Sequence, residues 1–134
     1  GDRCFSEPLV WVLHAGYLFL PRGILALAGE ILLPGLLGAA AAQHLWMAGA
    51  IGLMTLAVMT RATLGHSGQV LTAGVETVCL YLALVAAVLT RLVSGIFPEH
   101  AGWLQGMSGS FWIVAFGGFA VLYGPLLLKP KPER

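Results

Sequence analysis

The chain has 134 residues, of which 58% are hydrophobic and only 10% are charged. A water-soluble domain carries about 25% charged residues, so this shortage of charge indicates that most of the surface faces lipid. A formal net charge of +1 leaves no basic stripe to neutralise phosphates, which excludes nucleic acid as a partner. Cys4 and Cys79 are too few for a disulfide framework, and Cys79 lies in an apolar run where a small buried side chain is expected.

Four long apolar stretches follow one another along the chain, at residues 9–33, 44–61, 70–97 and 103–128. Each approaches or exceeds the roughly 20 residues that a helix needs to cross about 30 Å of hydrocarbon. Turn-forming residues separate the stretches, for example Pro34-Gly35 and Gly65–Gly68. The sequence therefore predicts an all-α, polytopic membrane protein in which residues 1–134 form a single unit of four transmembrane helices in an antiparallel bundle.

The first stretch contains three polar residues at membrane depth. His14 lies about one and a half turns inside it, and an ionisable side chain inside a span is a functional candidate. The alternative is a histidine that is hydrogen-bonded in the core. Arg22 follows Pro21, which can kink a helix. Glu30 has an outer depth comparable to that of Arg91 in the third stretch, so a Glu30–Arg91 ion pair is the simple structural expectation.

The second stretch combines groups that can bind metals on one helical face. At 100° per residue, an arc of about 160° holds six of its residues, namely His44, Met47, Met54, Thr55, Met59 and Arg61. Methionines alone are typical of a packing seam. Histidine and arginine on the same face favour a functional surface, because thioether and imidazole ligands suit Cu(I) or haem iron.

The remaining charged groups leave several alternatives open. Bis-histidine ligation of haem needs two imidazoles at matching depth, which His14 with His66, or His44 with His100, could provide. Haem propionates would favour an arginine partner, and the three candidates are Arg22, Arg61 and Arg91. Glu76 is either a proton-relay group or a carboxylate stabilised by the N-terminal dipole of the third helix.

Lysine and arginine predict the orientation of the chain. An even number of crossings places both termini on the side of the loop between the second and third helices. That side carries the excess of basic residues, namely Arg3, Arg61, Lys129, Lys131 and Arg134. The positive-inside rule then predicts that both termini are cytoplasmic. The chain starts at Gly1 without a recognisable signal peptide, so we expect either a trimmed start or a piece of a longer chain.

Three segments resemble the NnrS family, namely Trp11–Tyr17, Gly49–Gly68 and Tyr123–Leu127. Members of that family are bacterial polytopic membrane proteins described as containing haem and copper, and they are associated with the response to nitric oxide. The resemblance implies an inner-membrane location, b-type haem as cofactor, copper as a second metal and nitric oxide as a partner. Family members are much longer, and this chain resembles their last four helices.

The resemblance also implies roles for particular residues. His14, His44 and His66 become candidate haem or copper ligands, with Arg61 beside them, and no role is carried over to Arg22. Together with the helical face, this gives two predicted sets. The cofactor-binding set is His14, His44, His66, Arg61 and Arg91, and the metal set is His14, His44, His66, Met54 and Met59.

Two kinds of function fit these observations. The first is a haem-binding, or copper-binding, membrane protein in nitric oxide tolerance. The second is a structural four-helix subunit that packs against other transmembrane helices of a larger complex, in contact with membrane lipid and without a metal site of its own. Nitric oxide reduction by this chain alone ranks third, because the dense histidine cluster of a binuclear redox centre is missing from the sequence.

Overall fold

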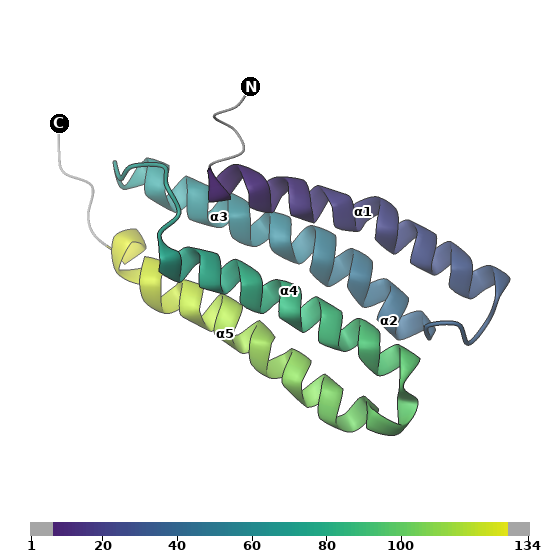
Figure 1. Cartoon of the computed structure of the whole chain (residues 1–134). Helices are drawn as coiled ribbons and strands as arrows, with labels where there is room; N and C mark the ends of the chain where they lie inside the picture. The colour runs from purple at the N-terminus through teal and green to yellow at the C-terminus, as the bar shows by residue number, and fades with distance from the viewer. Residues whose placement is uncertain (1–6, 129–134) are drawn as a thin grey trace.

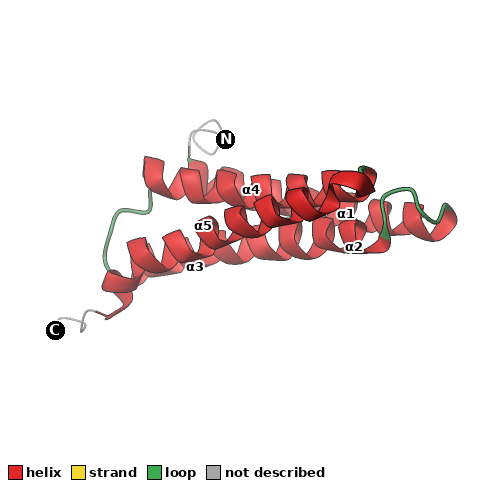
Figure 2. Ribbon diagram, turned by 90° about the horizontal axis from the view of Figure 1, so that it is seen from below, coloured by secondary structure: helices red, strands yellow, loops and turns green. Residues whose placement is uncertain are grey.

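The computed structural model describes residues 7–128, and this part of the chain contains helices and loops but no strand (Figures 1 and 2). Four of its helices are long and apolar enough to cross a membrane, which confirms the predicted fold class. The second span, Ala39–His66, is built from three segments. In chain order the elements are α1 (Pro8–Leu32), α2 (Ala39–His44), η2 (Leu45–Gly52), α3 (Leu53–His66), α4 (Val75–Ile96), η3 (Pro98–His100) and α5 (Ala101–Leu128).

The ends of the helices differ from the apolar stretches of the sequence. The second span extends beyond the expected 44–61 on both sides, because residues 39–43 and 62–66 also form backbone hydrogen bonds within the helix. The third helix starts at Val75, where Gly74 precedes it with an extended backbone. Val70 and Leu71 lie in the connecting loop, although both are apolar. Hydrophobicity therefore located the spans but not their ends.

The second span lies between α1 and the pair formed by α4 and α5. It packs along α1 on one side and against α4 on the other, and α5 packs along the whole of α4. The start of α1 and the end of α5 lie at the same end of the bundle as the α3–α4 loop (Figure 1). Leu53 and Leu56 of the second span meet Leu84 of α4 in the buried core.

Hydroxyl groups tie α4 and α5 together at two levels. Thr77 and Tyr123 form a buried hydrogen bond of 2.6 Å between their hydroxyl oxygens. Further along, Ser108 Oγ donates to the carbonyl oxygen of Ala87 at 2.7 Å. Because a polar group in an apolar interior is costly without a partner, these two contacts fix the register of α5 on α4.

Two further predictions from the sequence concern the burial of Cys79 and the orientation of the termini. Cys79 is exposed on α4, so the expectation of a buried thiol is wrong: the side chain points away from the helices that pack against α4. The orientation argument rested mainly on Arg3, Lys129, Lys131 and Arg134, which lie outside the described residues together with Cys4. The cytoplasmic position of the termini therefore stays a prediction.

Close approach of α1 to the second span depends on Gly23. This residue is buried, and a Cβ added there would lie 2.6 Å from Trp46 Cα and 2.9 Å from the Trp46 backbone nitrogen. Backbone atoms cannot move aside as a flexible side chain can, so only glycine allows this separation of the two helices.

We therefore predict that Gly23→Ala lowers the free energy of unfolding by about 1–3 kcal/mol, because the methyl group forces the helices apart. Gly106→Ala is the matched control, since a Cβ at Gly106 meets no atom within 4 Å. The control should change stability by no more than about 1 kcal/mol. Denaturation in mild detergent, followed by circular dichroism, measures both. Equal effects of the two substitutions would contradict the role of Gly23.

Candidate functional site

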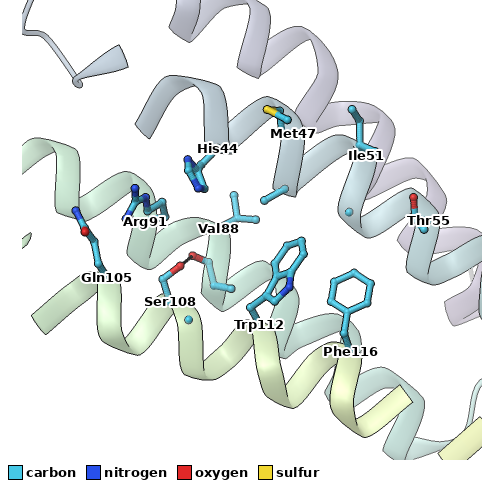
Figure 3. A pocket seen from close by; sticks show the side chains of 14 residues that line it. His44, Met47, Ile51, Thr55, Val88, Arg91, Gln105, Ser108, Trp112 and Phe116 are labelled. Carbon is cyan, nitrogen blue, oxygen red and sulfur yellow. Dashed lines mark hydrogen bonds between the residues drawn. The ribbon is translucent and has the colours of Figure 1, made fainter. Parts of the chain in front are cut away.

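A groove with a volume of about 640 Å³ lies between the second span, α4 and α5. This volume is within the range typical of small-molecule and cofactor sites. We call it the His44 groove. Ten of the side chains that line it are labelled in Figure 3: His44, Met47, Ile51 and Thr55 from the second span, Val88 and Arg91 from α4, and Gln105, Ser108, Trp112 and Phe116 from α5.

A π-helical segment shapes the wall that the second span contributes. η2 carries hydrogen bonds of the i→i+5 type, which put more residues into each turn than the 3.6 of an α-helix. Residues four apart, such as Met47, Ile51 and Thr55, consequently lie along one stripe that faces the groove. π-Helical segments are rare and occur frequently at functional sites.

The same segment overturns part of the predicted helical face. A constant 100° per residue assumed one continuous α-helix, whereas η2 rotates α3 relative to α2. His44, Met47 and Thr55 do line the groove together. Met54 instead lies against Gly16 of α1, and Met59 is partly exposed outside the groove. The six residues therefore do not share one face.

The His44 groove is polar at one end and apolar at the other (Figure 3). His44, Arg91, Gln105 and Ser108 gather at the polar end. Trp112 and Phe116 lie towards the other end, with their ring centroids 4.6 Å apart. The groove can therefore hold a molecule that has one polar edge and an extended apolar body.

The imidazole of His44 has a defined hydrogen bond. Its Nδ1 lies 2.8 Å from the carbonyl oxygen of Ala40, one turn earlier in the helix. A carbonyl oxygen can only accept, so Nδ1 carries the hydrogen and Nε2 is left with a free lone pair. Histidines that bind metals almost always donate their second nitrogen to such an acceptor, which fixes the ring orientation.

The other predicted histidine ligands lie elsewhere. His14 is exposed on α1 and repeats the local arrangement of His44, with Nδ1 2.8 Å from the Val10 carbonyl oxygen. His66 is the exposed last residue of α3. His100 pairs with Glu99 at 3.4 Å in η3. Among residues 7–128, no group of three or more histidine, cysteine, aspartate or glutamate side chains is close enough to hold a metal ion.

Of the three arginines considered for a propionate, Arg91 is the one that lines the His44 groove. Arg22 is exposed, and its guanidinium donates to the Leu18 carbonyl oxygen at 3.2 Å. Arg61 is exposed on α3 outside the groove. Arg91 therefore lies at the groove, whereas Arg22 and Arg61 lie outside it.

The expected Glu30–Arg91 ion pair is wrong. The Glu30 carboxylate accepts hydrogen bonds from the backbone N–H groups of Gly35, Leu37 and Gly38, at 2.7, 3.0 and 3.1 Å. Gly35 and Gly38 have φ angles of 91° and 79°, which let the loop curl around the carboxylate. The loop amides therefore satisfy this charge locally, and Arg91 has no ion pair with it.

Sequence reasoning did not single out Gln105, Ser108 or Trp112, which all line the groove. One signal was available for Gln105, because it is the single glutamine in the fourth apolar stretch. An amide side chain inside a span needs a polar neighbour. Its neighbours come from two other helices, which the sequence alone could not place.

Comparison with known proteins identifies one family. The sequence profile of a family described as NnrS protein matches residues 1–131, which is nearly the whole chain. No curated protein and no solved structure matches the chain significantly.

We predict that Glu30→Ala accelerates hydrogen exchange at the amides of Gly35, Leu37 and Gly38, because these groups lose their acceptor. Glu99→Ala is the control, since the Glu99 side chain is exposed and pairs with His100 instead. Mass spectrometry of exchanged peptides covering residues 33–38 makes the measurement. Unchanged exchange in Glu30→Ala would contradict the arrangement of the loop.

Proposed function

The chain belongs to the NnrS family, and on this basis we propose that it is a haem-binding protein of the bacterial inner membrane that acts in the response to nitric oxide. Four helices long and apolar enough to cross a membrane agree with this location. In the proposed orientation both termini are cytoplasmic, which places the His44 end of the groove towards the outer side of the membrane.

One observation carries the proposal: His44 presents a free Nε2 at the edge of a groove of suitable size. The donation of Nδ1–H to Ala40 leaves Nε2 able to bind iron. Val88, Trp112 and Phe116 form an apolar wall against which a flat macrocycle can pack. The residues present therefore fit a haem in this groove.

Bound haem would supply an iron centre that binds nitric oxide and exchanges one electron. The chain's own residues would do three things. His44 would hold the iron, Trp112 and Phe116 would exclude water, and Met47 would add a thioether to the same groove. His14 and His66 lie outside the groove, so the proposal relies on a single imidazole there rather than on a histidine pair.

Copper is the alternative metal in this proposal. Met47 lines the groove three residues after His44, and a thioether with an imidazole suits Cu(I). His14, His66, Met54 and Met59 stay predicted ligands for copper. Their positions on α1 and α3, away from the groove, would require further ligands to complete a site.

A second candidate function is a packing subunit of a larger membrane complex. The surface of α5 favours it, because Gly102, Gly106 and Gly109 contact no side chain within 4 Å of an added Cβ. Small residues of this kind allow close packing of transmembrane helices. Co-purification in a stable larger assembly, with metal content unchanged by substitution of His44, would favour this function over the first.

We predict that His44→Ala lowers haem occupancy of the purified protein by at least about tenfold, because even loss of a second-shell partner weakens metal binding by 10–100-fold. The Soret band and the iron content in mild detergent measure the effect. His100→Ala is the control, because His100 is exposed in η3 and pairs with Glu99.

Three results separate the alternatives. Loss of the Soret band in His44→Ala but not in His100→Ala supports the proposal. A copper signal that depends on His44, without iron, supports the copper alternative. A colourless wild-type protein that takes up neither haem nor copper would contradict both.

A further inference from the structure

The guanidinium of Arg91 has no partner in the part of the chain that the structure describes. Arg91 is half-buried on α4, about 7.5 Å from the end of that helix at Ile96. It lies within a segment long and apolar enough to cross a membrane. An arginine at such depth is costly in lipid, so it normally pairs with an anion or extends towards the membrane surface.

The groove itself supplies no counter-charge. No aspartate or glutamate is among the residues of segment 7–128 that line it. Glu30 is the acidic residue expected at this depth, and its carboxylate is held by loop amides. A ligand with a negative charge would therefore meet an available cation and no repelling carboxylate along the groove.

Gln105 provides a second side chain that can donate a hydrogen bond to a carboxylate. Its side chain and that of Arg91 both lie at the polar end of the groove, on α5 and α4 respectively (Figure 3). Ser108 is not available in the same way, because its hydroxyl hydrogen is donated to Ala87. The guanidinium can donate two parallel hydrogen bonds to a carboxylate, and the glutamine amide can donate another.

We propose that Arg91 and Gln105 form a carboxylate-recognition site that orients an amphiphilic ligand, with its acid group at this end and its apolar body against Trp112 and Phe116. The inference deepens the proposed function, because haem carries its two carboxylates on one edge of an apolar ring. A long-chain fatty acid shares this chemistry. The site recognises the ionised acid, and the corresponding ester lacks the charge that Arg91 pairs with.

The test pairs a change in the ligand with a change in the protein. Haem and haem dimethyl ester are titrated into wild-type protein and Arg91→Gln in detergent, and binding is followed by the Soret band. We expect the wild type to bind haem about 10–100-fold more tightly than the ester, as for hydrogen bonds to charged groups. Arg91→Gln should bind both with the same weak affinity, and Gln105→Ala should lose a smaller part of the preference.

Arg22→Gln is the matched control, because it removes a charge from an exposed position outside the groove. It should keep the full preference for the acid. Circular dichroism of each variant establishes that it is folded. A preference that is equal in wild type and Arg91→Gln, or absent from both, would overturn the proposal and would show that Arg91 merely extends towards the membrane surface.

A second probe separates this inference from the proposed function. A fluorescent long-chain fatty acid and its methyl ester are titrated into the same proteins. If no variant takes up haem but the wild type prefers the acid and Arg91→Gln does not, the haem proposal fails and the carboxylate site stands. If haem binds through His44 and neither haem nor the fatty acid is preferred over its ester, the carboxylate site fails and the haem proposal stands. The inference is overturned if neither probe shows a preference for the acid that depends on Arg91.

Discussion

In the hydrocarbon of a membrane every polar group, of the backbone and of the side chains, needs a hydrogen-bond partner, and this constraint governs the whole structure. The second span satisfies it through its π-helical segment at Leu45–Gly52 as well, because a π-helix, like an α-helix, keeps its backbone hydrogen bonds within the chain. The constraint also explains why hydroxyl groups such as that of Thr60 donate to a carbonyl oxygen one turn earlier. His14 and His44 do the same through Nδ1. The constraint thereby sets the tautomer of both histidines, and it leaves Nε2 free in each.

Because that local arrangement is common to His14 and His44, it does not by itself make a ligand site. What distinguishes His44 is its surroundings, which include a groove, a guanidinium without a partner among residues 7–128 and a wall of aromatic rings from α5. These surroundings depend on the packing of α5 along α4, which the Ser108–Ala87 and Thr77–Tyr123 hydrogen bonds hold in register. A shift of α5 along α4 would move Gln105 and Trp112 away from His44 while leaving every helix intact.

The sequence predicted the four spans because hydrophobic length alone determines them. It also singled out His44 and Arg91 as candidates, since ionisable side chains at membrane depth are often functional, and both residues line the His44 groove. Their roles stay predictions. The sequence could not predict the rotation that places Met54 against α1, because the π-helical segment contains only apolar and small residues with no evident signature.

The prediction of a Glu30–Arg91 ion pair was wrong because it considered only the position of the two residues along their helices. A similar depth in two apolar stretches contains no information on the loop amides that bind Glu30. The prediction that the Cys79 side chain is buried was wrong because a helix formed by an apolar run has both a buried and an exposed side.

The position of the groove at the side of the bundle bears on how a ligand reaches it. Met47 and Ile51 are each more than half exposed, at 55% and 52%, and Trp112 is 39% exposed. In a membrane these side chains would face lipid, so the groove opens sideways into the hydrocarbon and not through a polar mouth. A small uncharged molecule that dissolves in lipid can then enter laterally, whereas a charged group can settle stably only at the Arg91 end. The same geometry means that this chain covers one side of a ligand, and that lipid or a further helix must cover the other.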